Sequence, residues 1–289
     1  MYFISILIVL ALMQYRRDSF SVIQRDGWFY RLLQLVARKT DGNDYSVIFT
    51  VLLPCILLAL LLFLTGKWLW GLAELLICIV ILVYSIGRGE YIGRFEDYIE
   101  AWQTGQTARI PSILQALDKH YVPHMGDDAP DMHVAARRVF VYSAFTRLFV
   151  VLFWFSFLGP VAALLYRLLR LHYDHDKNAM AHLLITVMEW PVVRVFGISV
   201  ALLGNFSAAF SIWLATLLDV GLSASKVIHQ ITLAALNQDL HWQDKNRVYL
   251  SHVDDRASMA IQEIADIRQL LKRCLVFAVV VIAFLHILV

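Results

Sequence analysis

Long apolar runs dominate the first third of the chain. Residues 47–65 and 68–86 consist almost entirely of hydrophobic side chains, and only Gly66 and Lys67 separate the two runs. Wound as a helix, each run is about as long as the hydrocarbon core of a bilayer is thick. One acidic residue, Glu74, lies inside the second run. The pattern therefore predicts a transmembrane hairpin and an integral membrane protein.

Three further apolar segments follow, at residues 148–166, 195–218 and 275–289. Gly159-Pro160 interrupts the first of them, and we expect a kink or break there because proline lacks an N–H donor and clashes with the preceding turn. Residues 1–13 are apolar but shorter than a full span, so they form either a marginal membrane helix or an interfacial anchor. The whole pattern predicts an all-α polytopic membrane protein with four to five transmembrane helices.

Amphipathic patterns occupy much of the chain between the apolar segments. Hydrophobic residues recur at helical spacing within residues 19–36, 110–117 and 254–273, and residues 221–240 are moderately amphipathic. The helix over 254–273 is predicted to continue directly into the apolar segment at 275–289. These stretches predict amphipathic helices on the cytoplasmic side of the membrane.

The elements divide the chain into five regions. These are an N-terminal apolar segment with an amphipathic helix, the hairpin, a cytoplasmic helical region, two transmembrane helices with an outer loop, and cytoplasmic helices with a C-terminal membrane helix. Their predicted boundaries are residues 1–45, 46–86, 87–146, 147–218 and 219–289.

Lysine and arginine residues set the expected orientation. Both flanks of the hairpin are basic, and cytoplasmic loops are enriched in these residues, so both flanks are predicted to be cytoplasmic. Residues 170–191 then form an outer loop, and residues 219–273 lie inside. Pro191 would occupy the first turn of the fourth span, where proline is common.

Composition supports the membrane interpretation and excludes some alternatives. Hydrophobic residues make up 60% of the chain and charged residues 17%, and both values are unusual for a soluble protein. The formal net charge of +2 and the lack of a basic stripe argue against nucleic acid as a partner. Cys55, Cys78 and Cys274 all lie in or beside apolar runs and form no CxxC pair, so we interpret them as buried hydrophobic residues.

Candidate chemistry is sparse. His172, His175 and Asp176, with His182 nearby, form the densest group of metal-ligand residue types, but no HExxH motif is present and we predict no metal site. The segment 87–89 (Gly-Arg-Gly) could hold a phosphate but lacks the GKS/T ending of a nucleotide-binding loop. No GxSxG or SxxK motif provides a nucleophile. The residues alone therefore disclose no reaction, and we predict no catalytic residues and assign no cofactor.

Several blocks of sequence resemble a known family. They are Phe153-Trp154 with Gly159-Pro160-Val161, Tyr166 and Arg170; Tyr84-Ser-Ile-Gly-Arg-Gly89 with Tyr98 and Ala101-Trp102-Gln-Thr-Gly105; and Trp190-Pro-Val-Val-Arg194 leading to Ala201-Leu-Leu-Gly204. In their order and over nearly the whole chain, these blocks are similar to the AmpE family of bacterial inner-membrane proteins. AmpE-like proteins are associated with induction of chromosomal β-lactamase, alongside a cytoplasmic amidase that recycles cell-wall muropeptides.

The resemblance implies a multi-pass protein of the bacterial inner membrane that acts as a sensor or signalling modulator, and the lack of recognisable catalytic residues favours a role without catalysis. The expected partners are the lipid bilayer, a small anionic ligand such as a muropeptide or a nucleotide, and the recycling amidase or another membrane protein. Arginine and tryptophan side chains suit such a ligand because they pair with anionic groups or stack on flat ones. The predicted ligand-binding residues are Arg88, Arg94, Trp102, Arg137, Arg138, Trp190 and Arg194.

Two other functions stay open at this point. The same blocks are more distantly similar to the CobD/CbiB cobinamide-phosphate synthases, which would imply a nucleotide-dependent, amide-forming membrane enzyme. The acids and asparagines of those enzymes are missing here, where the chain reads Tyr142-Ser-Ala-Phe145 and Arg167-Leu-Leu-Arg-Leu-His172. A muropeptide transporter is the other alternative. Polar residues such as Glu74 and Asn205, together with a broken helix, are features of the substrate sites that transporters hold near the middle of the bilayer.

Overall fold

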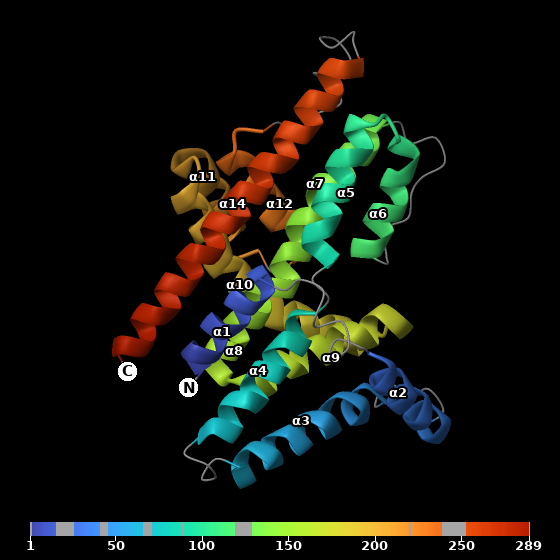
Figure 1. The fold of residues 1–289 in the computed structure, drawn as a ribbon, viewed down its shortest axis with the longest axis vertical. Coiled ribbons are helices and arrows are strands. Elements are labelled where there is room, and N and C mark those ends of the chain that lie inside the picture. The colour runs from blue at the N-terminus through green and yellow to red at the C-terminus, as the bar shows by residue number, and fades with distance from the viewer. Residues whose placement is uncertain are drawn as a thin grey trace. The chain divides into compact units, whose positions relative to one another are not determined.

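The computed structural model describes residues 2–15, 26–40, 46–65, 71–87, 90–118, 129–219, 221–238 and 253–288 (Figure 1). Within these ranges the chain folds into helices joined by turns and contains no strand. It forms two compact units, and each is assembled from segments that are distant in sequence. Unit 1 comprises Met1–Gly89, Arg147–Glu189 and Ile282–Val289, and unit 2 comprises Glu90–Thr146 and Trp190–Val281.

Unit 1 is organised around one central helix. Helix α9 contacts α3, α4 and α8, and α1 contacts α4 and α8. The central helix has a wide buried face because small and branched apolar residues such as Ala163 and Leu168 recur along it. The helices of this unit are α1 (Tyr2–Tyr15), α2 (Gly27–Thr40), α3 (Ser46–Thr65), α4 (Leu72–Ile86), α8 (Val150–Leu158) and α9 (Pro160–Asp176).

Unit 2 packs shorter helices around α7, which contacts α5, α6 and α12. Helix α11 lies against α12, and a short 3-10 turn, η2 (Thr107–Arg109), leads into α6. The helices are α5 (Glu90–Gln103), α6 (Ile110–Leu117), α7 (Ala129–Ala144), α11 (Phe206–Thr216) and α12 (Ala224–Ala235). Two long helices, α10 (Ala179–Leu203) and α14 (Val253–Leu288), contribute residues to both units.

Four helical segments are long and apolar enough to cross a membrane, which confirms the prediction of an all-α polytopic membrane protein. They are Val47–Thr65, Met132–Leu158, Ala179–Leu203 and Ala257–Ile287. Of the second arm predicted over residues 68–86, the described part forms α4 (Leu72–Ile86), and residues 66–70 lie outside the described ranges.

The break predicted at Gly159-Pro160 is confirmed. Gly159 has a positive φ of 78°, which glycine adopts without strain, and Pro160 occupies the first turn of α9. The break divides the segment over 148–166 between α8 and α9. Helix α8 continues from α7 through a π-helical turn, η3 (Phe145–Phe149), so the long apolar segment is Met132–Leu158.

The loop predicted over residues 170–191 is mostly helical, while its placement on the outer side of the membrane stays a prediction. Helix α9 runs to Asp176 and α10 begins at Ala179. Asn178 caps α10, since its side-chain oxygen accepts bonds from the backbone N–H groups of Met180 (2.8 Å) and Ala181 (3.2 Å). Pro191 consequently lies inside α10 rather than in a first turn.

The span predicted over residues 195–218 is split in two. Helix α10 ends at Leu203, and α11 begins at Phe206 after the turn at Gly204 and Asn205. The turn is fixed by a distant segment, because the Asn205 N–H donates to the carbonyl of Ala235 at 2.7 Å. A β-carbon on Gly204 would lie 2.7 Å from that same carbonyl oxygen, so only glycine fits here.

The two amphipathic predictions at the ends of the chain have different outcomes. For the stretch predicted over residues 19–36, the described part forms α2 from Gly27, while residues 19–25 lie outside the described ranges. The continuity predicted between residues 254–273 and 275–289 is confirmed, because α14 is a single helix of 36 residues.

Candidate functional site: a buried Tyr-His-Arg-Glu network

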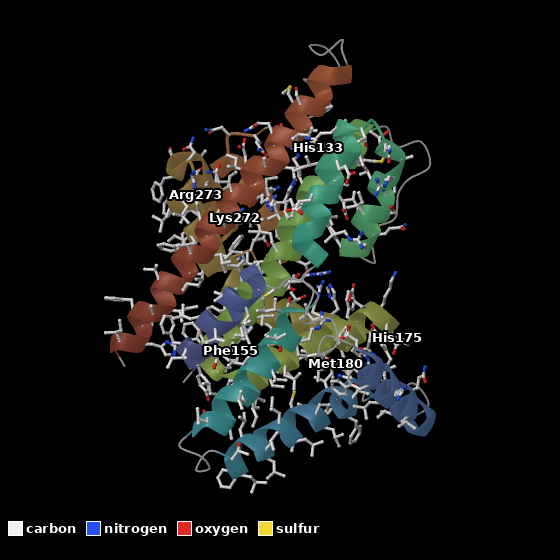
Figure 2. All side chains as sticks on the ribbon, in the orientation of Figure 1. His133, Phe155, His175, Met180, Lys272 and Arg273 are labelled. Atoms are coloured by element: carbon white, nitrogen blue, oxygen red, sulfur yellow. The ribbon has the colours of Figure 1, made fainter. Side chains whose placement is uncertain are left out.

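A cluster of polar side chains lies inside unit 2, where α5, α7 and α14 supply its members. His133 Nε2 and Arg137 Nη1 both contact the same oxygen of Glu263, Oε2, at 2.9 and 3.2 Å. The other ring nitrogen of His133 lies 2.8 Å from the hydroxyl of Tyr98. We call Tyr98, His133, Arg137 and Glu263 the Arg137 network; His133 is labelled in Figure 2.

The local sequence explains how the network is assembled. His133 and Arg137 are four residues apart on α7, so their side chains project from the same face, and both are 0% exposed. Glu263 precedes the buried Ile264 and Ile267 on the apolar side of α14. A buried guanidinium costs several kcal/mol in desolvation unless a carboxylate compensates it, and Glu263 supplies that carboxylate.

An indole ring borders the network. Trp102 lies one turn after Tyr98 on α5, and its ring centroid is 6.3 Å from that of His133. Its side chain is buried, yet within the described part of the chain the Nε1 hydrogen has no acceptor. An unsatisfied buried donor is costly, so Trp102 is a donor that a bound ligand can use.

The neighbouring face of α7 carries a second basic residue. Arg138 Nε donates to Ser225 Oγ on α12 at 2.9 Å, and its side chain is exposed. One turn further along α12, His229 is buried, and this burial, together with the charges of Arg137 and Arg138, lowers its pKa from the ordinary 6.5 to about 4. The α7–α12 face therefore has a positive potential and a histidine that stays neutral at physiological pH.

Unit 1 contains a polar cluster of its own. The Tyr166 hydroxyl donates to Glu189 Oε1 at 2.7 Å, and Arg170 Nη1 lies 3.7 Å from the same oxygen. Asp26 and Arg167 form a separate ion pair at 3.2 Å.

Comparison with known proteins identifies the family. Residues 1–288 match the model of the family described as "Regulatory signalling modulator protein AmpE". The chain belongs to the AmpE family. It matches no curated protein and no solved structure.

Membership in the AmpE family confirms the resemblance drawn from the sequence blocks and supports a signalling-modulator role. Together with the four apolar helices, it makes the chain a multi-pass membrane protein. The distant similarity to cobinamide-phosphate synthases stays a prediction.

The structure distributes the predicted ligand residues of this AmpE chain over several places. Trp102 and Arg137 lie at the network, and Arg138 faces α12. Arg94 pairs instead with Asp97 on its own helix at 3.3 Å. Arg88 lies outside the described residues.

Trp190 and Arg194 form a local contact on α10. The Arg194 guanidinium carbon lies 5.1 Å from the centroid of the Trp190 ring, as in a cation–π pair. Arg194 also donates to the carbonyls of Leu217 (2.9 Å) and Asp219 (3.1 Å), so it caps the C-terminal end of α11.

The histidine-acid group at residues 172–176 does not gather at one site, although His175 Nδ1 contacts the carboxylate of Asp176. His172 is buried with Nδ1 3.3 Å from Thr50 Oγ1 on α3, whereas His175 and Asp176 are exposed. Burial is the main cause of the lowered pKa of His172. Among the residues that the structure describes, no three His, Cys, Asp or Glu side chains lie close enough to hold a metal ion.

Sequence reasoning missed His133, Glu263 and His229 as candidate site residues. Two features of the sequence could have indicated them. His133 and Arg137 are four residues apart where the chain becomes apolar, and Glu263 is an acid on the hydrophobic side of the helix over 254–273. The identity of the partner helix had no local signal.

Proposed function

We propose that this AmpE-family protein is an inner-membrane sensor that modulates β-lactamase induction and cell-wall recycling by binding a small anionic ligand, without transforming it. The binding surface is the α7–α12 face beside the Arg137 network. The observation that supports this proposal is the pair of adjacent arginines, Arg137 and Arg138, whose charges act on the buried, neutral His229.

Arg138 is the residue expected to contact the ligand directly. Its side chain is exposed, and its Nε bond to the Ser225 hydroxyl is a neutral contact that a carboxylate or phosphate can replace with a stronger one. Muropeptides carry carboxylates and nucleotides carry phosphates, so both have the required chemistry. Arg137 contributes to the positive potential from inside the protein.

The network offers a route from the ligand to α14. An anion near Arg138 also attracts the Arg137 guanidinium, which Glu263 holds at 3.2 Å. Any shift of Arg137 changes the contacts of Glu263 and hence of α14. We propose that this response is what an amidase or another membrane protein detects.

Calorimetry on the detergent-purified protein tests ligand binding. Titration with a muropeptide and, separately, with a nucleotide is expected to give saturable binding to one of them, and Arg138→Ala is expected to weaken it at least about tenfold, or 1.4 kcal/mol. Arg109→Ala is the matched control, since Arg109 is an exposed arginine of the same unit whose guanidinium donates to Gln106 Oε1 three residues earlier. Wild-type affinity in a folded Arg138→Ala protein would contradict the proposed surface.

Complementation tests the pathway. In a strain lacking the protein, the wild-type chain and Arg109→Ala are expected to restore the normal β-lactamase response to a β-lactam, and Arg138→Ala to leave it altered. Equal responses with and without the protein would overturn the pathway assignment. Recovery in the inner-membrane fraction checks the proposed location.

A further inference from the structure

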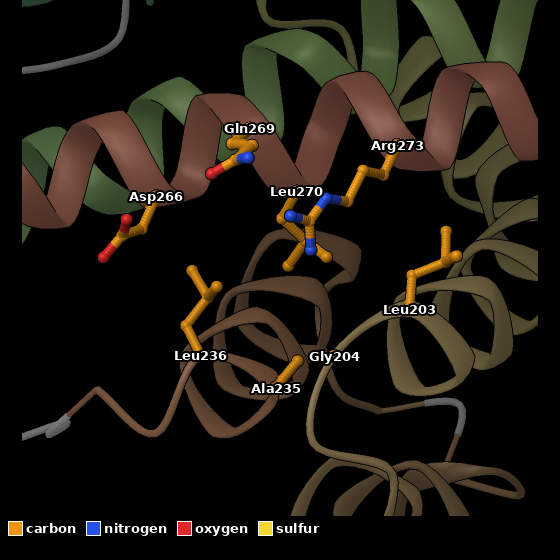
Figure 3. Close-up of a pocket in the computed structure, with 8 residues that line it drawn as sticks. All are labelled: Leu203, Gly204, Ala235, Leu236, Asp266, Gln269, Leu270 and Arg273. Carbon is orange, nitrogen blue, oxygen red and sulfur yellow. The ribbon is translucent and has the colours of Figure 1, made fainter.

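A second feature of unit 2 is a polar cavity of about 370 Å³. It is bounded by the end of α10, the end of α12 and the middle of α14, as Figure 3 shows. The apolar part of its wall includes Leu203, Leu236 and Leu270. Its polar side chains are Asp266, Gln269 and Arg273, all from α14.

These polar residues line one face of α14 in a fixed charge order. Asp266, Gln269 and Arg273 follow helical spacing, and a helical rise of about 1.5 Å per residue places the two charged positions about 10 Å apart along the axis. In Figure 3 the Arg273 side chain reaches back along the helix towards Leu270, which shortens the gap between the charges.

The two charged side chains, Asp266 and Arg273, differ in their hydrogen-bond partners. Asp266 Oδ1 accepts a hydrogen bond from Gln262 Nε2 at 2.9 Å, which leaves acceptor capacity on the carboxylate. Arg273 has neither a hydrogen-bond nor an ion-pair partner within the described ranges, although its guanidinium carries five donors.

The position of the hydrocarbon follows from the rest of the helix. Beyond Arg273, α14 is apolar apart from His286, and Val276 and Val280 are exposed on its surface. Lipid tails are the solvent for such a surface, so the hydrocarbon begins directly after Arg273. Of the two charged residues that line the cavity, Arg273 is therefore the nearer to the hydrocarbon and Asp266 the farther.

We propose that this cavity binds the headgroup of a phospholipid that carries an ammonium group beyond its phosphate, as phosphatidylethanolamine does. Arg273 binds the phosphate, Asp266 accepts from the ammonium, and an acyl chain lies along Val276 and Val280. The charge order of the protein matches that of the lipid, in which tail, phosphate and ammonium follow one another away from the hydrocarbon.

Other headgroups fit this order less well. Phosphatidylglycerol satisfies Arg273 but leaves Asp266 facing a group without positive charge. Phosphatidylcholine has a quaternary ammonium that cannot donate a hydrogen bond to a carboxylate. The cavity should therefore select the primary ammonium and not merely a negative charge.

Lipid titration of the full-length protein in detergent, read by native mass spectrometry, tests the proposal. With matched acyl chains, phosphatidylethanolamine is expected to bind at least about fivefold more tightly than phosphatidylcholine or phosphatidylglycerol. Asp266→Asn should abolish this preference while binding of phosphatidylglycerol persists. Arg273→Gln should weaken all three lipids. Soluble glycerophosphoethanolamine, tested in parallel, shows whether the headgroup binds without its tails.

Lys272→Gln is the matched control, because Lys272 adjoins Arg273 on α14 without lining the cavity (Figure 2). This variant should keep the preference for phosphatidylethanolamine. Equal binding of the three lipids to the wild type, or an unchanged preference in folded Asp266→Asn protein, would overturn the proposal. Loss of preference in Lys272→Gln would also overturn it, because the selectivity would then reflect the net charge of the surface. The experiment does not involve the anionic ligand proposed for the α7–α12 face, so its failure would leave the proposed function untouched.

Discussion

Each unit contains a cluster built from a tyrosine, a glutamate and an arginine, but the two clusters bury opposite charges. In unit 1, the Glu189 side chain is 4% exposed, and Arg170 approaches it from a position that is 22% exposed. In unit 2, the Arg137 side chain is 0% exposed, and Glu263 approaches it with 14% exposure. The inner group is thus an anion in unit 1 and a cation in unit 2.

The difference matters because a buried carboxylate and a buried guanidinium respond differently to the loss of an oppositely charged partner. A buried carboxylate that loses its cation can take up a proton and become neutral. A guanidinium cannot lose its proton in a protein, so a buried arginine depends on its carboxylate. Unit 2 should therefore be the more sensitive of the two to loss of one partner.

The largest expected effect is the loss of the Glu263 carboxylate. Glu263→Ala removes the carboxylate that contacts Arg137 and His133, and we expect it to lower the free energy of unfolding by about 3 to 5 kcal/mol. Denaturation in mixed micelles measures the change. Asp97→Asn, which removes a partly exposed pair with Arg94, should cost less than about 1 kcal/mol.

A double variant sharpens this test. Replacing Arg137 by Met together with Glu263→Leu removes both charges, and apolar residues often replace a buried ion pair without loss of stability. The double variant should therefore recover most of what Glu263→Ala loses. If it is as unstable as the single variant, the buried cation is not the cause.

The second prediction concerns pH. Because the folded pKa of His229 is about 4 and the unfolded value is about 6.5, protonation favours the unfolded state. The contribution is fully present above pH 6.5 and is lost as the pH falls towards 4, at up to about 1.4 kcal/mol per pH unit. His229→Gln should flatten this part of the stability profile, as measured by thermal unfolding.

His172 provides the comparison within unit 1. Its pKa is also lowered by burial, but the carboxylate of Asp176 opposes that shift, whereas at His229 two arginines reinforce it. His172→Gln should therefore flatten the profile less than His229→Gln does. An equal or larger effect would mean that burial alone sets both values.

The smallest effects are expected in unit 1. Tyr166→Phe removes the 2.7 Å hydrogen bond to the buried Glu189, and we expect a cost of about 1 to 3 kcal/mol. Arg170→Ala removes a longer and partly exposed contact and should cost about 1 kcal/mol or less. Chemical denaturation of both variants checks the order. A larger loss for Arg170→Ala would contradict the idea that the anionic cluster tolerates loss of its cation.

Local sequence signals predicted some of the breaks in the helices but not others. The break at Gly159-Pro160 could be predicted from these two residues alone, since a proline cannot continue the preceding helix. The turn at Gly204-Asn205 has no proline, and its N–H bond goes to the carbonyl of Ala235, about 30 residues later in the chain. The prediction of a single span over 195–218 was wrong because the pattern of neighbouring residues carries no information about that contact.

The candidate site was predictable to a similar, limited extent. The sequence nominated Trp102, Arg137 and Arg138 by residue type, and the structure places the first two beside one network. It also nominated Arg94 and Arg194, which are held by partners outside the network. Residue type indicates what a side chain can bind, but not which neighbour already occupies it.

The sequence by itself determined the membrane-spanning character of the chain, its helical class, the break at Gly159-Pro160 and the unbroken α14, because chain length, hydropathy and proline geometry act locally. Only the tertiary structure decided that Arg137 is buried against Glu263, a residue 126 positions away. The physical reason is that the cost of burying a charge depends on its partner, and the partner is chosen by helix packing rather than by neighbours in the chain.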